Sequence, residues 1–568
     1  MGIVHVGRIK AAIKKRFESL IDLSDVKPSA SAEERESTLL TRCLSAFAIA
    51  ELARVDDKIA AKAVVDGYGD NGIDALYYDV AEATCYIVQS KWHHEGKGTI
   101  DLGDTLKFVK GIRELLNFDL GNFDKLKHKA TEIEAALTNI DGTFVTVVVH
   151  TGEQKLAPGV QQPLDAFLAE QNDVTELLKL RALNQFDLHS IVAQQATGAT
   201  IKFNVMLREW GRIVDPHLAY YGQVEIEDVA RWKEFGQQLY SKNLRGFKGS
   251  TDVNEGIVHT ARNNPQNFFY FNNGITIVCD RLSKLPQGGS NRESGVFECD
   301  GASVVNGAQT VGSIISAVEN GPNGFHNARV LVRLISLEKC EPRFGPELTR
   351  AANTQNRIEK KDFAAQDPEQ ERLKTDLFLD CGKTYAFRTG DPIPAPDEGC
   401  ILDDAAIALA CAQSDLGLCV QAKREVSRLW ENIEQPPYTI LFNNGLSAFK
   451  LWRAVEVLRL VDMTLKNAQA TLAGRERLIA VHGNRFVLHR VFREIKTLEG
   501  TAVDFDKEKQ GVASIAQAIL ARTIAATQAL FSSSYPANVF KSASKCKDLT
   551  QQILSPMGGT PGSQLGLI

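Results

Sequence analysis

Apolar residues in the first 206 positions follow two spacings that alternate along the chain. A spacing of three or four positions, typical of helices, covers residues 37–55, 102–116 and 164–180. Short runs rich in β-branched and aromatic side chains, typical of strands, cover residues 73–80, 83–92 and 199–206. The run 142–150 (GTFVTVVVH) is almost entirely apolar and predicts a strand buried on both faces, in a central or parallel position. Alternating strands and helices favour an α/β sandwich.

The last third of the chain has a different pattern. Helical periodicity predominates there and covers residues 402–416, 446–472, 475–496 and 514–531. The segment 384–396 holds three prolines close together and predicts an exposed loop or linker, while the glycines and proline after Ser555 predict a disordered tail. We therefore expect a multidomain α/β protein with an α/β domain over residues 1–200, a second α/β region over 201–400, a mainly α-helical region over 401–555 and a disordered tail over 556–568.

Length and composition bound the class of protein. A chain of 568 residues is too long for one typical core, and its net charge is −5. A nucleic-acid enzyme needs only a locally basic groove, so this charge neither supports nor excludes a nucleic-acid substrate. The ten cysteines include no C-x-x-C pair, which argues against a zinc ribbon and indicates reduced thiols. No signal peptide and no bilayer-spanning apolar run is evident, so we expect a cytoplasmic protein with no membrane partner.

Three residues with complementary chemistry lie within the segment DGYGDNGIDALYYDVAEATCYIVQSKW. Asp74 stands at the start of one predicted strand, whereas Gln89 and Lys91 stand two residues apart on the next, so these two side chains share a face. A hairpin would gather all three at one end of the sheet. A carboxylate holds a hard divalent cation, and an amine orients a water and offsets charge on a phosphate. The combination suits metal-assisted phosphodiester hydrolysis, and its bland alternative is a surface hairpin with polar ends.

The order GID at 72–74, followed by QSK at 89–91, resembles the Mrr-like branch of the PD-(D/E)xK nucleases over roughly the first third of the chain. The resemblance implies a restriction-endonuclease-like α/β sandwich. It also implies that Asp74 and Gln89 bind Mg²⁺ or Mn²⁺ and that Lys91 positions the attacking water. Because an amide oxygen is a weaker ligand than a carboxylate, we expect the site either to bind one metal ion rather than two or to bind it weakly until a substrate phosphate joins the coordination shell.

Four further carboxylates precede the motif. In the nuclease family a helix before the core often supplies one more metal-binding or metal-orienting glutamate. Glu51 is the candidate here and Glu36 the second choice, although either one fits a solvated helix face. Asp66 and Asp70 lie close to the proposed site, and one of them could help to bind metal. Turn chemistry with the neighbouring glycines explains these two aspartates better.

A second series of motifs begins after residue 240. In chain order these are NLR at 243–245, VN at 253–254, FNNGIT at 271–276, NGAQT at 306–310 and NTQN at 353–356. The series resembles the AIPR family, whose name records abortive infection and phage resistance. Because the pieces occur in the family's order, the series is more specific than any one of them. The resemblance implies a central α/β AIPR region that continues into the helical region.

Asparagines and their polar neighbours in these motifs are the candidate binding residues. NGAQT follows apolar residues and predicts a strand passing into a helix, whose first backbone amides could hold an anion. Arg357, Lys360 and Lys361 add positive charge on a predicted helix. A pocket for a nucleotide or a nucleic-acid end is about as well supported as plain turn chemistry beside a solvated helix. The candidates are Asn272, Asn273, Asn306, Gln309, Thr310, Asn353, Gln355 and Arg357.

The two resemblances together imply a metal-dependent endonuclease of an anti-phage defence system, which cleaves DNA and carries the AIPR region as a sensor or regulator. The alternatives are an RNA-cleaving toxin nuclease and a non-catalytic nucleic-acid-binding scaffold. An unregulated nuclease would harm its host. We therefore expect autoinhibition that a phage component or a nucleotide relieves, and we expect a homo-oligomer.

Overall fold

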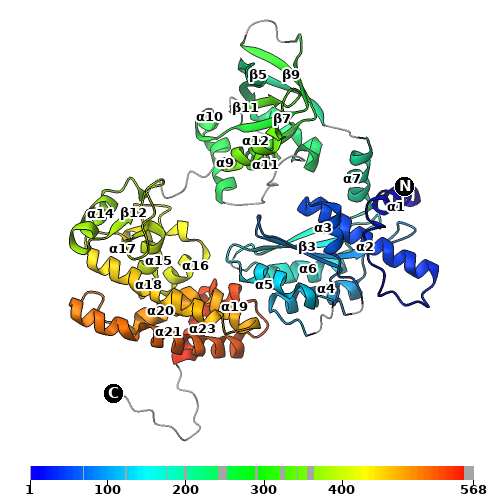
Figure 1. Cartoon of the computed structure of the whole chain (residues 1–568). Helices are drawn as coiled ribbons and strands as arrows, with labels where there is room; N and C mark the ends of the chain where they lie inside the picture. Colours follow the sequence, from blue (N-terminus) through cyan, green and yellow to red (C-terminus); the bar gives the residue numbers. More distant parts are fainter. Residues whose placement is uncertain are drawn as a thin grey trace. The chain divides into compact units, whose positions relative to one another are not determined.

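The chain forms two compact units, described one at a time, in the computed structural model drawn in Figure 1. The first joins Met1–Val192 to Glu359–Ile568, and the second is Ala193–Ile358. The structure describes residues 2–67, 69–121, 125–173, 175–197, 201–240, 252–287, 292–319, 325, 328–341, 343–354 and 364–554. The tail 556–568, which the composition predicts to be disordered, lies outside these residues.

A four-stranded sheet forms the centre of the amino-terminal part, counted over the described residues. Its strands, in spatial order, are β1 (Ala75–Asp79), β2 (Thr84–Lys91), β3 (Thr143–His150) and β4 (Leu178–Leu183). The β1–β2 pair is an antiparallel hairpin, whereas β3 is parallel to both β2 and β4. The prediction of a central, parallel strand at 142–150 is therefore confirmed.

Helices cover both faces of this sheet. On one face, an apolar core that includes Phe47, Val88 and Leu188 lies beneath α1 (Gly2–Phe17), α2 (Ala32–Ala53), α3 (Asp57–Lys62) and α7 (Gln185–Thr197). On the other, a core that includes Ile87 and Phe108 lies beneath α4 (Leu102–Leu116), α5 (Ala130–Thr138) and α6 (Pro158–Gln171). The α/β sandwich predicted by the alternating pattern is thus present as an architecture.

The predicted helix 164–180 is wrong at its carboxy-terminal end. Helix α6 ends at Gln171, and Leu178 begins strand β4, which pairs with Phe144 of β3. The sequence from Leu178 alternates apolar and polar residues, a pattern that a short helix or a strand can carry. The segment from Leu178 forms a strand because pairing with β3 satisfies the backbone hydrogen-bond donors and acceptors of both segments.

The carboxy-terminal part of the first unit is mainly helical, as its periodicity predicts. Its larger helices are α14 (Pro368–Cys381), α15 (Leu402–Ala412), α16 (Leu416–Arg424), α18 (Ala448–Gln469), α19 (Gly474–His482), α20 (Asn484–Glu494), α21 (Ala502–Phe531) and α23 (Ala543–Leu554). A short pair, β12 (Thr384–Ala386) and β13 (Gly399–Ile401), flanks the proline-rich segment. The predicted helical stretch 475–496 is two helices, separated at Gly483.

The sandwich and the carboxy-terminal helices share one apolar core. Leu478 and Tyr535 pack with Phe144 and the α5 side chains. Tyr535 donates from its hydroxyl to the Leu137 carbonyl at 2.7 Å, and His482 Nε2 lies 2.7 Å from the same oxygen. Burial lowers the pKa of His482 to about 3, so the ring is neutral and structural. The two ends of the chain are therefore parts of one folded body.

The second unit is built on a seven-stranded sheet, counted over the part of Ala193–Ile358 that the structure describes. Its strands, in spatial order, are β10 (Ser303–Asn306), β7 (Ile275–Cys279), β11 (Arg329–Ser336), β6 (Ala219–Glu225), β5 (Lys202–Ile213), β9 (Ser294–Asp300) and β8 (Arg281–Lys284). Its helices include α8 (Ile226–Ala230), α9 (Asp252–Asn263), α10 (Phe268–Phe271), α11 (Ala308–Glu319) and α12 (Phe344–Thr354). The predicted strand 199–206 corresponds to the first part of β5, which begins at Lys202, while residues 199 and 200 lie outside the described residues.

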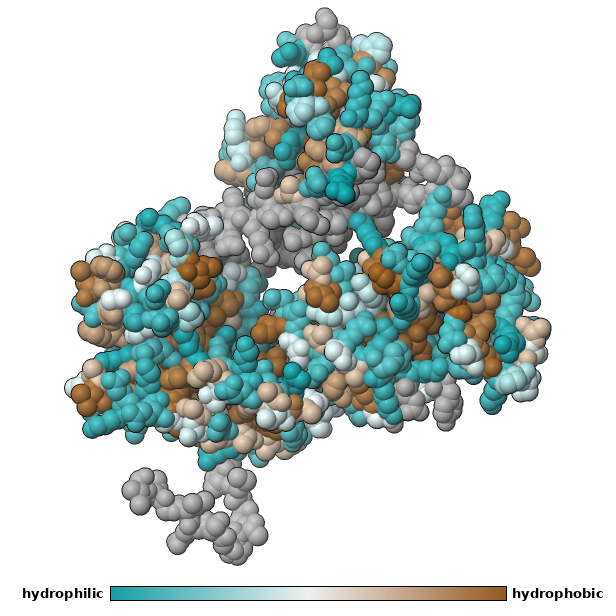
Figure 2. All heavy atoms as spheres, viewed as in Figure 1, coloured by the Kyte–Doolittle hydropathy of each residue, from teal (hydrophilic) through white to brown (hydrophobic). Residues whose placement is uncertain are grey.

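Hydrophilic residues dominate the visible surface in Figure 2, and apolar residues occur there in scattered patches. Among the described residues, no helix combines the length and the apolar character needed to cross a bilayer.

Candidate metal centre

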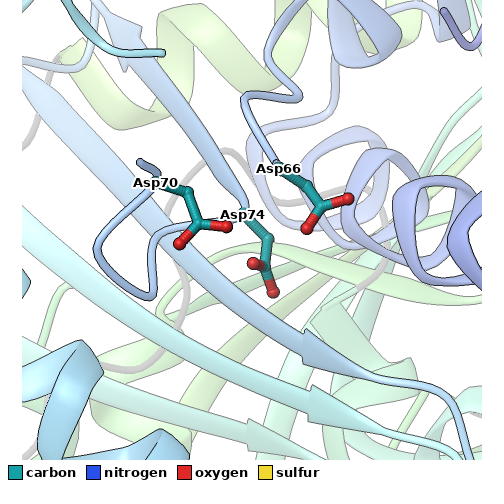
Figure 3. Close-up of side chains that lie close together, drawn as sticks. All are labelled: Asp66, Asp70 and Asp74. Carbon is teal, nitrogen blue, oxygen red and sulfur yellow. The ribbon is translucent and has the colours of Figure 1, made fainter. Parts of the chain in front are cut away.

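Three aspartates come together where the chain enters strand β1 (Figure 3). Asp74 immediately precedes β1, Asp66 follows a short bridge between Val64 and Ala75, and Asp70 lies in the turn between them. The Asp74 carbonyl accepts from the Asp66 backbone N–H at 3.0 Å, which holds the two ends of the turn together. One carboxylate oxygen from each residue lies within 4.8 Å of the others.

The turn itself explains why Asp70 points inward. Its carboxylate accepts from the backbone N–H groups of Gly67 at 3.2 Å and Gly72 at 2.8 Å. Gly72 has φ +83°, and a Cβ there would lie 2.9 Å from the Phe108 backbone nitrogen, so only glycine fits. Turn chemistry and participation in the cluster are therefore both properties of Asp70, although the sequence had favoured the turn alone.

Asp74 is buried with one oxygen engaged. Its Oδ2 accepts from the Ser90 backbone N–H at 2.6 Å and from the Ser90 hydroxyl at 3.1 Å. Burial, together with the negative charges of Asp66 and Asp70, raises the pKa of Asp74 well above its ordinary value. The protonated form of Asp74 is therefore more favoured in the ion-free protein than it is for an ordinary carboxyl group, and a bound cation would favour the carboxylate instead.

Two cationic groups face the other aspartates. Arg42 donates to Asp66 at 2.8 Å and also holds Asp25 at 2.7 Å, so its charge is shared. Lys107 donates to Asp70 at 2.8 Å. Burial raises the pKa of Asp66 in spite of Arg42. The cluster thus holds three buried or half-buried carboxyl groups against one shared guanidinium and one ammonium.

Strand β2 presents Gln89 and Lys91 toward the first turn of α4, as their spacing predicts. Gln89 Nε2 donates to the Asp104 carbonyl at 2.9 Å, which turns Oε1 the other way. That oxygen is buried and has no hydrogen-bond partner in the described part of the chain, an expensive state for an amide. Lys91 Nζ lies 2.5 Å from the Asp104 carboxylate, which is held in place by the helix that Asp101 caps.

The negative charge of Asp74 contributes to the pKa of Lys91. Burial lowers the pKa of Lys91, but the hydrogen bond that Lys91 donates to Asp104 and the charges of Asp104, Asp101 and Asp74 outweigh burial and raise the pKa above its ordinary value. Lys91 is therefore a permanent cation, half exposed, beside the carboxylate cluster. Asp74, Gln89 and Lys91 gather at one end of the β1–β2 hairpin, as their spacing predicts.

The two candidate glutamates lie elsewhere on the same sandwich. Glu51 accepts from Arg16 at 2.6 Å, in a network that includes Asp57. Glu36 pairs with Lys10 at 2.8 Å. Neither carboxylate is among the three grouped oxygens of the cluster. In place of a helix glutamate, the structure brings Asp66 and Asp70 to Asp74. The bridge between Val64 and Ala75, which folds the chain back here, is what brings them together.

A pocket of about 490 Å³ adjoins the cluster on the Asp66 side. Lys58 and Lys62 line it from helix α3, one turn apart, and Lys125 and His128 line it from the opposite segment. Lys58 and Lys62 are exposed, so their ammonium groups are available to solution anions. Lys58 and Lys62 thus add exposed positive charge beside the acidic cluster, although Asp22 and Asp25 also line this pocket and Lys125 pairs with Asp25 at 2.6 Å.

In the second unit, two predicted residues meet at the β10–α11 junction. Thr310 donates from its hydroxyl to Asn272 Oδ1 at 3.2 Å, and the same oxygen accepts from the Gly274 N–H at 3.2 Å. Gly307 connects the strand to the helix with φ +85°, and a Cβ there would lie 2.6 Å from the Gly274 carbonyl oxygen. The predicted passage from strand to helix is confirmed.

The remaining candidates are placed less closely. Asn306 ends β10, Asn273 is exposed, and Gln309 lies half-buried in the first turn of α11. Asn353 lies in α12. Gln355 and Arg357 lie outside the described residues, together with Lys360 and Lys361.

Comparison with known proteins finds a similarity over one part of the chain. Residues 240–390 match the AIPR protein family, which covers the motifs of the second unit from 243 onward. Neither a curated protein nor a solved structure matches the chain.

Proposed function

We propose that this protein is a metal-dependent endonuclease of an anti-phage defence system and that it cleaves phosphodiester bonds in DNA. The observation that carries the proposal is the joint placement of three clustered aspartates, one unpartnered buried amide oxygen and one permanent ammonium group at the end of the β1–β2 hairpin. The AIPR match over residues 240–390 supports the defence role.

The donor set fits a hard divalent cation such as Mg²⁺ or Mn²⁺. Asp74 offers the carboxylate oxygen that does not accept from Ser90. Asp66 and Asp70 each offer one further carboxylate oxygen, and Gln89 offers its Oε1. All of these are the oxygen donors that such cations prefer. When bound, the cation would act as a Lewis acid on a phosphate oxygen and lower the pKa of a coordinated water.

The chain's own residues supply the remaining chemistry. Lys91 holds its charge at neutral pH, so it can orient an attacking water and offset negative charge on the reacting phosphate. Asp104 holds the lysine beside the cluster until substrate arrives. Lys58 and Lys62, one helical turn apart on α3, can contact the phosphates that flank the scissile bond.

A plasmid-nicking assay tests the proposal. The wild type is expected to nick supercoiled DNA with Mg²⁺ or Mn²⁺ and to be silent in EDTA, while Asp74→Ala and Lys91→Ala lose the activity. Lys97→Ala is the matched control, because Lys97 is an exposed lysine paired only with Glu95 at 3.2 Å. Equal cleavage by wild type and both site variants would show that the site is wrongly assigned.

Two further arms of the same assay sharpen the proposal. Single-stranded RNA offered in parallel distinguishes the DNA enzyme from an RNA-cleaving toxin. Addition of phage lysate or of a nucleotide mixture tests the expected activator when the isolated protein is silent. Phage plating on cells that carry wild type or Lys91→Ala tests the defence role. Equal plaque counts on both strains would argue against a nuclease-based defence.

A further inference from the structure

A second pocket, of about 380 Å³, lies within the first unit and away from the aspartate cluster. Residues 140–143 and 175–177 of the sandwich form one wall, just before strands β3 and β4. The carboxy-terminal helices form the other, through the end of α16, the start of α20 and Lys541. Its volume lies in the range of small-molecule sites, roughly 300–1,000 Å³.

The pocket is marked by a buried lysine without a counter-charge. Lys423, in the last turn of α16, is 6 % exposed. Its ammonium donates to Asn484 Oδ1 at 3.0 Å, and the described residues provide no carboxylate within ion-pair distance. An ammonium group has three donors, so two remain for a ligand. Burial and the charges of Arg485 and Lys541 lower the pKa of Lys423 to about 7.

Lys541 brings a second ammonium group to the same pocket. It follows α22 (Pro536–Phe540), and its side chain makes no ion pair among the residues described. Burial lowers its pKa, while Asp141 across the pocket acts in the opposite direction. Two cations held near each other, both partly removed from water, repel each other unless an anion lies between them.

The charged side chains that line the pocket are four cations, Lys423, Arg424, Arg485 and Lys541, and three carboxylates, Asp141, Glu176 and Glu425. Arg485 pairs with Asp462 at 3.0 Å, and Glu425 accepts from Arg428 at 3.0 Å. Helix α20, eleven residues long, begins at Asn484 and directs its positive end at the pocket. Apolar side chains from both walls complete the lining, among them Ile140, Leu177 and Val426. The pocket thus combines a surplus of positive charge with an apolar wall.

We propose that this pocket binds a small phosphate-bearing ligand of the nucleotide class, whose phosphate oxygens Lys423 and Lys541 contact. The apolar wall is the place for a planar base. The site is independent of the proposed nuclease centre, because it is built from other residues and needs no divalent cation.

The test is isothermal titration calorimetry on the full chain, in buffer that contains EDTA so that the aspartate cluster is not filled. The probes are ATP and inorganic pyrophosphate, with sodium chloride at matched ionic strength as the screening control. Wild type is expected to bind ATP. It is expected to bind pyrophosphate more weakly than ATP, because pyrophosphate lacks the base that would contact the apolar wall. Lys423→Met and Lys541→Met are each expected to weaken ATP binding at least about tenfold.

Lys547→Met is the matched control, since Lys547 is an exposed lysine of α23 and the substitution removes the same charge. Circular dichroism confirms that each variant is folded. ATP binding by the control but not by the two pocket variants supports the site. The proposal is overturned if neither probe binds wild type, or if both pocket variants bind ATP as tightly as wild type does.

Discussion

The two ends of the four-stranded sheet hold opposite surpluses of charge. Strand β2 pairs with β3 so that Lys91 lies beside His150 at the aspartate end, whereas Thr143 begins β3 at the end that faces Lys423. The three clustered aspartates lie at one end, and Lys423 and Lys541, neither of them ion-paired among the described residues, lie at the other. A buried lysine elsewhere in the first unit is ion-paired. Lys129, 9 % exposed, donates to Glu132 and to the Leu76 carbonyl, both at 2.9 Å.

The contrast between Lys129 and Lys423 shows what an unbalanced buried charge indicates. Both lysines are removed from water, and desolvation disfavours the charged form of each. Lys129 recovers that cost from a carboxylate and a carbonyl, so its role is structural. Among the described residues, Lys423 has one hydrogen-bond partner, the neutral Asn484 side chain. The aspartate cluster shows the opposite imbalance, because its three carboxyl groups face one shared guanidinium and one ammonium group. We therefore interpret a buried charge without a counter-charge as an indication of a binding site, where a ligand supplies the opposite charge.

The largest effect is expected from Asp74→Asn. Cleavage should fall at least about 100-fold, because one charged ligand of the metal is lost. In EDTA at pH 8 the same variant should unfold at a higher temperature than wild type. The raised pKa of Asp74 means that metal-free wild type loses stability as pH rises from the ordinary value toward the folded value. Unchanged nicking, or a lower unfolding temperature in EDTA, would contradict this account.

Lys423→Met should stabilise the ligand-free protein on the acid side of neutrality. The folded pKa of about 7 lies below the ordinary 10.5, so the native state binds fewer protons than the unfolded state between these values. Stability of wild type therefore falls as pH drops through that window, and the whole penalty is present below pH 7.

At pH 6 the gain is expected to be on the order of a few kcal/mol, measured by urea unfolding, and it should shrink toward pH 10. Lys129→Met provides the contrast. It should destabilise at both pH values, because it removes the cation that pairs with Glu132 and the donor to the Leu76 carbonyl. If both lysine variants lost stability equally, the distinction between a structural and a ligand-seeking lysine would fail.

Magnesium should raise the unfolding temperature more at pH 8 than at pH 5. A cation and a proton compete for Asp74, whose pKa is raised by burial and by Asp66 and Asp70. We expect a shift of about 2–4 °C at pH 8 with saturating Mg²⁺ and a smaller one at pH 5, measured by differential scanning calorimetry. An equal shift at both pH values would indicate binding to other, ordinary carboxylates.

The smallest effect is expected at Gln89. Gln89→Leu removes the unpartnered oxygen and should weaken Mg²⁺ binding about tenfold, whereas Gln89→Glu should strengthen it by adding a charge. Calorimetric titration of Mg²⁺ into each variant measures both changes. Identical affinities for the two variants would place Oε1 outside the metal's reach.

Local patterns in the sequence predict the helices and strands well and predict the charged sites only in part. Helix α4 begins and ends at the predicted residues, and the spacing of Gln89 and Lys91 correctly gives them one face. The grouping of Asp66 and Asp70 with Asp74 depends on the bridge that folds the chain back at Val64, which no periodicity indicates.

The second pocket lies further beyond the reach of local reasoning. Lys423 acquires its environment from segments more than a hundred residues away in either direction, near 141 and 541. Within α16 the residue looks like an ordinary basic side chain in the last turn of a helix, where lysine is common. Only packing of the helices against the sandwich removes it from water.

The discontinuous first unit affects the order in which the molecule can mature. A ribosome releases the sandwich long before it has made Leu478 and Tyr535, which complete the apolar core under α5. The newly synthesised amino-terminal domain therefore exposes this apolar surface until the later helices are made, and such exposure favours chaperone binding or aggregation. A chain interrupted before α19 would contain every residue of the aspartate cluster, but it would lack the side chains that complete the core under α5 and part of the pocket around Lys423.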